Sequence, residues 1–214
     1  MHEKIYVTLS ALFCCLILIG NITYRKFVII EVPYLYSFEI SVGAILYPLT
    51  FLVTDIITEF YKKDKATFTV RLGILLNIVT ALIIISMDNI KATDWSVIND
   101  DIFHKVFGFF GYSFLGSMIA TFISQTIDIY IYLLIRSATK GRFLGLRNVV
   151  STSVSLLIDT VIVIVFLAYV GVLPKEQVTT LIYNSYLWKL SFTIALVPVF
   201  YLCVKIIKHI LSYS

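Results

Sequence analysis

The stretch YPLTFLVTDIITEFY, residues 47–61, is apolar over most of its length and yet carries Asp55 and Glu59. Threonine recurs at every fourth position from Thr50, so one helical face is densely polar. Placing an aspartate at the centre of a membrane helix costs about 2.5 to 3.5 kcal/mol, unless the side chain faces the bundle interior or water. The stretch therefore predicts a membrane helix that turns a polar face toward its neighbours.

The rest of the chain has the composition of an integral membrane protein. Of its 214 residues, 59% are hydrophobic and only 14% are charged, against about a quarter charged in soluble domains. Apolar runs close to the roughly 20 residues that cross a bilayer occur at 5–24, 36–60, 68–87, 107–135, 148–171 and 178–204. We predict an all-α bundle of six transmembrane helices that forms a single domain, residues 1–214.

The net charge of +4 is distributed in a way that indicates a membrane orientation rather than nucleic-acid binding. One side of the predicted membrane carries Lys4, Lys62, Lys63, Lys65, Arg71, Arg136, Lys140, Arg142, Arg147, Lys205 and Lys208. The other side carries Arg25, Lys26, Lys91, Lys105 and Lys175, beside an acidic loop. Because cytoplasmic loops are richer in lysine and arginine, we expect both termini in the cytoplasm of a multi-pass cell (inner) membrane protein.

Two later apolar runs share a polar pattern. The spacing Thr-x-x-Ser-x-x-x-Asp occurs at Thr121, Ser124 and Asp128, and again at Thr152, Ser155 and Asp159. Residues three, four and seven apart return to one helical face. Each set therefore forms a polar stripe along one helix. Two antiparallel helices could point these stripes, together with Gln125, at one cavity. The alternative is that the acids form interhelical ion pairs with Arg71, Arg147 or Lys189 and only hold the bundle together.

Paired carboxylates and a glutamine amide suit a flat heterocycle that carries N–H groups and a carbonyl. Tyr47 and Phe51, four residues apart, could supply an aromatic face for it. Sugars and amino acids stay open as ligands on this reasoning.

Enzymatic patterns are lacking in the sequence, and so are metal or cofactor motifs. The three histidines lie at the ends or in a loop, and Cys14, Cys15 and Cys203 have no metal-ligand spacing. We expect a transporter with no cofactor and no metal site.

Three motifs resemble the queuosine precursor transporter family, also described as vitamin-uptake-transporter-like proteins. They are YPLTFLVTDIITEFY, then SQTIDIYIY at 124–132, then LRNVVSTSVSLLIDT at 146–160. The resemblance implies a six-helix importer of 7-deazaguanines such as preQ0, preQ1 or queuine. By matching position, it places the family's polar residues at Asp55, Glu59, Gln125, Asp128, Arg147, Asn148, Ser155 and Asp159.

Two positions depart from the family's usual pattern. Lys62 stands where glycine usually follows the first motif, and Leu156 stands where glutamine usually precedes the last Leu-Ile-Asp. The second change removes one bidentate hydrogen-bonding partner from the expected site.

The main functional hypothesis is a secondary importer in which Asp55, Asp128 or Asp159 exchanges a proton as substrate binds. One alternative is the substrate-binding subunit of an energy-coupling-factor importer for a vitamin-like molecule, since those subunits have a similar six-helix architecture. Another is a ligand-free structural or assembly protein. We expect a purine-like small molecule and membrane lipid as partners, and we leave a homo-oligomer open.

Overall fold

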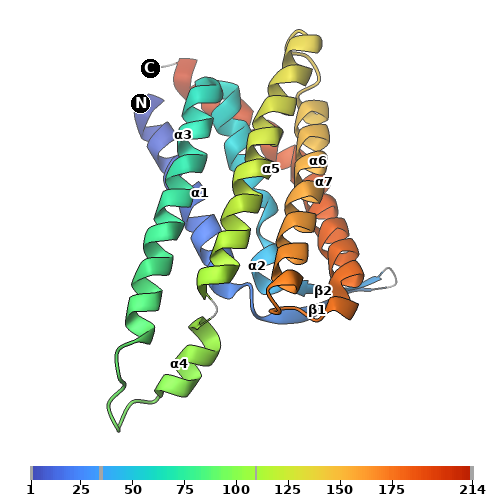
Figure 1. Ribbon diagram of the computed structural model, residues 1–214. Coiled ribbons are helices and arrows are strands. Elements are labelled where there is room, and N and C mark those ends of the chain that lie inside the picture. Colours follow the sequence, from blue (N-terminus) through green and yellow to red (C-terminus); the bar gives the residue numbers. More distant parts are fainter. Residues whose placement is uncertain (1, 34–35, 109, 213–214) are drawn as a thin grey trace.

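Helices make up most of the chain, and their apolar composition and length suit a membrane interior (Figure 1). The computed structural model describes residues 2–33, 36–108 and 110–212. Its elements are α1 (His2–Thr23), β1 (Phe27–Val32), β2 (Tyr36–Ser41), α2 (Val42–Ile45), α3 (Pro48–Asp88), α4 (Asp100–Phe107), α5 (Phe110–Ala138), α6 (Leu144–Tyr169), the 3-10 turn η1 (Lys175–Gln177) and α7 (Val178–Ser212). Within these described residues, five helical segments are long and apolar enough to cross a membrane: 2–23, 42–88, 114–138, 144–169 and 175–211.

The long helix α3 is broken at Lys62, whose φ of 65° and ψ of −179° are not helical. The break divides α3 into two limbs, residues 48–61 and 63–88, which meet at the end of the bundle where both termini lie (Figure 1). Tyr6 donates a hydrogen bond to the carbonyl of Lys65 at 3.2 Å, and Tyr61 donates one to the carbonyl of His2 at 2.8 Å. The break therefore sits beside the start of α1, and the conformation of Lys62 is one that glycine adopts far more easily.

The prediction of one helix over 36–60 is wrong at its N-terminal end. Residues 36–41 form β2, which pairs antiparallel with β1 so that Ile30 faces Phe38. Hydropathy does not separate a strand from a helix, and the β-branched and aromatic residues of these two segments favour a strand. Pro48 begins α3 instead of kinking it, because proline lacks the N–H that the first helical turn leaves unpaired anyway.

The hairpin β1–β2 lies across one end of the bundle, opposite the termini (Figure 1). Tyr36 donates a hydrogen bond to Asn184 Oδ1 of α7 at 2.8 Å, and the Phe38 ring packs against Trp188, with centroids 5.6 Å apart. Behind the hairpin, Gly43 of α2 contacts the backbone of Gly20 in α1 so closely that a side chain at Gly43 would overlap it. The hairpin end is therefore held to both α1 and α7.

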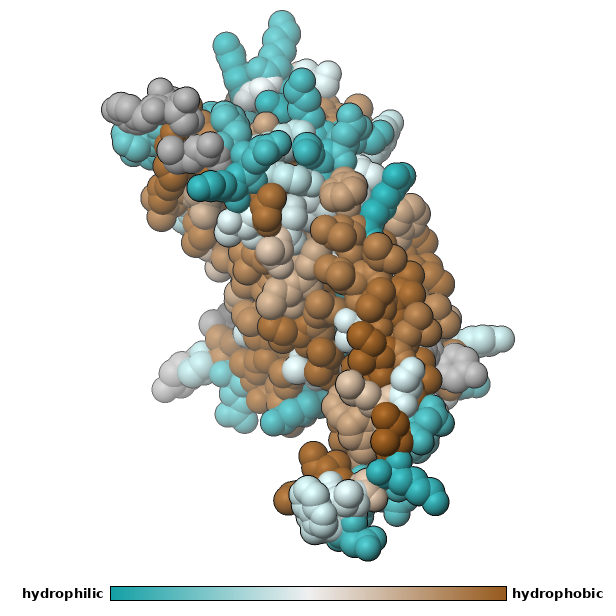
Figure 2. Space-filling model, turned by 90° about the vertical axis from the view of Figure 1, so that its left-hand side faces the viewer, coloured by the Kyte–Doolittle hydropathy of each residue, from teal (hydrophilic) through white to brown (hydrophobic). Residues whose placement is uncertain are grey.

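The segment predicted as a polar loop at 88–106 contains the short helix α4. Asn99 caps it by accepting a hydrogen bond from the Ile102 amide at 2.9 Å, and Asp100 and Asp101 occupy its first turn. This capping pattern was readable in the sequence. Figure 2 shows hydrophilic side chains at both ends of the molecule and a hydrophobic band between them, as expected for a bilayer-spanning surface.

Candidate functional site

Five buried polar side chains from three helices meet in the middle of the bundle, and we call them the central polar cluster. They are Asp55 of α3, Asp128 of α5, and Asn148, Ser151 and Ser155 of α6. The α6 members share one face because they lie three and seven residues apart. The Asn148 amide donates a hydrogen bond to Asp55 Oδ2 at 2.5 Å. Asp128 lies next to Asp55, with Ser151, Thr152 and Ser155 around it.

Several atoms of this cluster have no hydrogen-bond partner within the described part of the chain. They are Asp55 Oδ1, both carboxylate oxygens of Asp128 and Ser155 Oγ, and next to them Thr152 Oγ1 and the Arg147 Nε and Nη1 atoms. A buried polar group left unpaired costs about 1 to 3 kcal/mol, and such groups are rare in folded proteins. Several of these atoms are neighbours of one another around Asp128, and a ligand or water among them would satisfy them together.

Toward the termini, the central polar cluster is bounded by a buried ion pair between Glu59 and Arg147, which we call the terminus-end pair. Arg147 Nη2 lies 3.1 Å from Glu59 Oε2, and Tyr132 donates a hydrogen bond to the same oxygen at 3.1 Å. The Arg147 guanidinium also lies over the Tyr132 ring, 5.1 Å from its centroid. Arg136 adds a longer contact of 3.7 Å to Glu59 Oε2.

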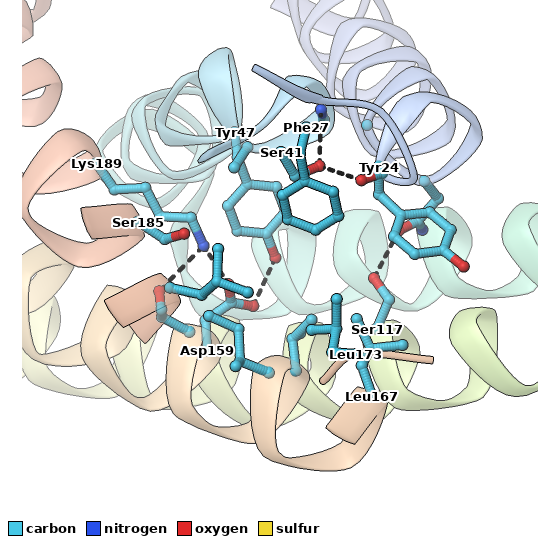
Figure 3. Close-up of a pocket in the computed structure, with 18 residues that line it drawn as sticks. Tyr24, Phe27, Ser41, Tyr47, Ser117, Asp159, Leu167, Leu173, Ser185 and Lys189 are labelled. Atoms are coloured by element: carbon cyan, nitrogen blue, oxygen red, sulfur yellow. Dashed lines mark hydrogen bonds and ion pairs between the residues drawn. The ribbon is translucent and has the colours of Figure 1, made fainter. Parts of the chain in front are cut away.

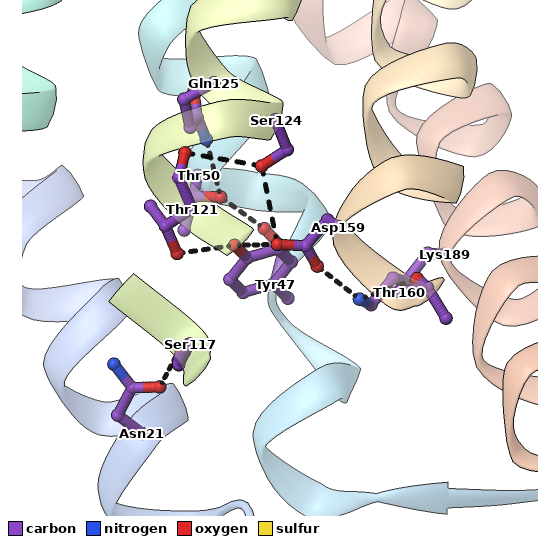
Figure 4. Close-up of polar contacts among 10 residues, drawn as sticks. All are labelled: Asn21, Tyr47, Thr50, Ser117, Thr121, Ser124, Gln125, Asp159, Thr160 and Lys189. Atoms are coloured by element: carbon purple, nitrogen blue, oxygen red, sulfur yellow. Dashed lines mark hydrogen bonds and ion pairs between the residues drawn. The ribbon is translucent and has the colours of Figure 1, made fainter. Parts of the chain in front are cut away.

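Toward the hairpin, a second ion pair joins Asp159 of α6 to Lys189 of α7, and we call it the hairpin-end pair (Figure 4). Lys189 Nζ lies 2.9 Å from Asp159 Oδ2 and 3.1 Å from Thr160 Oγ1. Tyr47 donates a hydrogen bond to Asp159 Oδ1 at 2.8 Å, and Ser124 reaches the same oxygen at 3.4 Å. Asp159 is therefore hydrogen-bonded by side chains from three other segments.

Between the hairpin-end pair and the central polar cluster lies Gln125, which is fully buried (Figure 4). Its Oε1 accepts a hydrogen bond from Thr54 at 2.9 Å, and its Nε2 lies 3.4 Å from Thr50 Oγ1. Polar groups thus follow the first limb of α3 from Tyr47 through Asp55 to Glu59. At 1.5 Å per residue, this limb carries Asp55 about 12 Å from Tyr47 along the helix axis.

A cavity with a free volume of about 90 Å³ lies on the hairpin side of Asp159 (Figure 3). Tyr47, Asp159 and Lys189 line one part of it, and residues of α1, the hairpin, α2, α5, α6 and α7 line the rest. A second hollow of about 390 Å³ shares Tyr24, Phe27, Leu173 and Leu181 with it. The two hollows are therefore neighbours at the hairpin end of the molecule.

The polar stripes that the repeat forms on α5 and α6 do face each other, but the two aspartates do not lie opposite one another. Since the helices are antiparallel, Ser124 lies against Asp159, and Asp128 lies against Ser155. The two repeat aspartates are therefore at different levels of the bundle and do not point at one spot.

The structure sorts the predicted site residues into three groups. It brings Asp55, Asp128, Asn148 and Ser155 together in the central polar cluster, pairs Glu59 with Arg147, and places Asp159, Tyr47 and Gln125 toward the hairpin. Phe51 packs edge to face on Tyr47, with centroids 5.8 Å apart, and does not line the cavity. Of the ion pairs considered from the sequence, the structure shows that of Asp159 with Lys189 and that of Glu59 with Arg147.

Sequence reasoning left three neighbours out of the site. Ser151 lies four residues before Ser155 and could have been found from that spacing, and Lys189 is a lone charge inside the apolar run 178–204. Tyr132 carried no signal, since an aromatic residue in a membrane helix is unremarkable. Among the described residues, no three His, Cys, Asp or Glu side chains are grouped so as to hold a metal ion.

The fold and this site define a multi-pass membrane protein with a polar interior. Residues 41–203 match the family described as "Putative vitamin uptake transporter", and the chain belongs to that family. It is also 30% identical over 182 residues to a protein of Bacillus subtilis (strain 168) named "Probable queuosine precursor transporter", an alignment that covers 85% of this chain and 79% of that protein. No solved structure matches the chain. The protein is thus a transporter of a small molecule, not an enzyme.

Proposed function

We propose that this protein imports queuosine precursors, the 7-deazaguanines preQ0, preQ1 or queuine, and that it works as a secondary transporter. The name of the Bacillus subtilis relative supports the substrate class. The observation that carries the proposal is the set of unpaired polar atoms in the central polar cluster. Carboxylate oxygens without partners suit the ring N–H and amino groups along the edge of a deazaguanine.

The proposed binding residues are the ten expected from the sequence, with different roles. Asp55 and Asp128 accept hydrogen bonds from the substrate, while Asn148 and Ser155 supply further polar contacts. Arg147 and Glu59 close the site toward the termini, and Tyr47 and Asp159 close it toward the hairpin. Gln125 lies between Asp159 and Asp128, and Phe51 packs behind Tyr47.

The proposed topology counts the two limbs of α3 separately, which gives six crossing segments with both termini on one side. The excess of positive charges near that side supports a cytoplasmic location of both termini in a cell membrane protein. The hairpin then faces outward, and the cavity next to Asp159 opens toward the source of the imported substrate. The resemblance to energy-coupling-factor subunits stays a prediction.

Proton coupling is proposed for Asp55 and Asp128, since these neighbouring carboxyl groups can share a proton and release it as substrate binds. Asp159 suits this role less well because Lys189 already neutralises it.

Uptake of labelled preQ1 into proteoliposomes tests the proposal. We expect saturable uptake that a collapsed proton gradient abolishes, and a loss of about tenfold or more in Asp128→Asn, since a hydrogen bond to a charged group contributes about 1.5 to 3 kcal/mol. Thr126→Ala, on the exposed face of the same helix, is the matched control. Unchanged uptake in an Asp128→Asn, Asp159→Asn double variant would overturn the site, and gradient-independent uptake would overturn the coupling.

A further inference from the structure

The cavity on the hairpin side of Asp159 has the composition of a ligand site in its own right. Most of its surface is apolar, with Phe27, Val163, Leu167 and Leu181 in its walls. Asp159, Ser185 and Lys189 lie together at one side of it, while Tyr24, Ser41 and Ser117 lie elsewhere in its lining (Figure 3). Small-molecule sites combine apolar walls with a few well-placed polar groups in this way. The cavity is distinct from the central polar cluster, none of whose five members lines it.

Lys189 is the most unusual side chain of this cavity. It is only 6% exposed, although it lies within an apolar helix where a lysine is costly. Its ammonium group has three hydrogens to donate, and Asp159 and Thr160 account for two. The group also lies over the Tyr47 ring, 4.6 Å from its centroid. A donor and an acceptor, Lys189 and Asp159, thus stand side by side at the cavity wall.

Such a pair is complementary to a carbonyl oxygen that neighbours a ring N–H. A ligand with this edge can accept from the ammonium of Lys189 and donate to the carboxylate of Asp159, so it replaces their mutual contact with two charge-assisted hydrogen bonds. Ser185 lines the same cavity and provides a further hydroxyl group. No member of the central polar cluster lines this cavity or the neighbouring outer hollow.

We propose that this cavity is an outer substrate subsite, in which Lys189 donates to the ligand's carbonyl oxygen and Asp159 accepts from the adjacent ring N–H. This proposal rests on the proposed import of 7-deazaguanines, which carry such an edge. Lys189 is then a specificity-determining residue that selects the carbonyl before the substrate passes Tyr47 to the central polar cluster.

The first test compares two ligands. Wild-type protein should bind preQ1 at least about tenfold more tightly than the analogue in which an amino group replaces the ring carbonyl, since tenfold corresponds to about 1.4 kcal/mol. In Lys189→Met this ratio should fall several-fold, because only the contact with Asp159 then distinguishes the two ligands, whereas Lys205→Met, at an exposed position of the same helix, should keep it. An unchanged ratio in Lys189→Met overturns the subsite and leaves the proposed function standing.

A second test does not require a lysine variant to fold. In a background with Cys14, Cys15 and Cys203 replaced by serine, Ser185→Cys should react with a small methanethiosulfonate reagent, and preQ1 should slow the reaction several-fold. Ser96→Cys, in the loop before α4, is the control that preQ1 should leave unprotected. Equal rates with and without preQ1 at Ser185→Cys, in protein that still takes preQ1 up, overturn the subsite alone. Wild-type protein that neither binds nor transports any deazaguanine overturns both proposals.

Discussion

Asp128 and Asp159 hold the same place in the two copies of a sequence repeat, but the bundle surrounds them differently. Asp159 receives Lys189 at 2.9 Å and Tyr47 at 2.8 Å. Asp128 is 0% exposed, and neither of its oxygens has a hydrogen-bond partner in the part of the chain that the structure describes. Its neighbour across the helix interface is a second acid, Asp55.

This difference comes from the helices outside the repeat. Within α5 and α6 the two aspartates are alike, and each faces hydroxyl groups of the other stripe. The helix α7 supplies a cation at the hairpin-end pair, whereas the first limb of α3 supplies a carboxylate beside Asp128. The same motif therefore holds one carboxylate beside a cation and one beside a second acid.

Breaking the hairpin-end pair should have the largest effect on stability. Lys189→Met leaves the Asp159 carboxylate buried without its counter-charge, which typically costs 3 to 5 kcal/mol. We expect the free energy of unfolding in detergent to fall by about that amount, and the double variant Asp159→Leu, Lys189→Met to recover most of it. Lys205→Met serves as the control and should unfold like wild type. Wild-type stability in Lys189→Met would mean that Asp159 and Lys189 are not paired.

Breaking the terminus-end pair should cost less. Glu59→Gln removes the carboxylate that Arg147 contacts, but the guanidinium keeps its position over the Tyr132 ring, and the glutamine can still accept a hydrogen bond from Tyr132. We expect a loss of about 1 to 3 kcal/mol in the same unfolding measurement. Glu3→Gln, an exposed acid of α1, should change it little. A loss as large as that of Lys189→Met would mean that the two ion pairs contribute equally to stability.

The break in α3 at Lys62 fixes how far along the bundle Asp55 lies, and so its position opposite Asp128. A substitution at this break is expected to give a small gain in stability. Lys62 has a positive φ in a region of backbone conformation that is almost confined to glycine. Lys62→Gly should therefore raise the free energy of unfolding by about 1 kcal/mol. At the neighbouring helical position, Lys63→Gly should lower it by about the same amount. If both variants lost stability, the break would not lie at Lys62.

The sequence predicted the membrane-spanning character and most helix positions, because hydropathy over about 20 residues decides them. It failed at residues 36–41, where a short apolar strand and a helix look the same. It also predicted which polar side chains face inward, since helical spacing shows this directly. Which of them pair depends on the neighbours that each helix meets, so the contact of Lys189 with Asp159 could only be offered as one of several alternatives.

The structure also shows where the two residues that depart from the family pattern lie, Lys62 and Leu156. Lys62 stands at the one position of α3 with a non-helical conformation, which explains why glycine is usual there. Leu156 is fully buried next to Ser155. A glutamine at that position would add a buried amide to α6, and its replacement by leucine leaves hydrogen bonding in this part of α6 to Ser155 and Asp159.

The proposed substrate contact of Asp128 is tested most directly by ligand-induced stabilisation. A ligand that binds only the folded protein raises its melting temperature. We predict that preQ1 or queuine raises the melting temperature of the wild-type protein. We also predict that Asp128→Asn melts at nearly the wild-type temperature without ligand and shows a clearly smaller rise with it. An equal rise in Asp128→Asn and wild type would contradict the proposed contact.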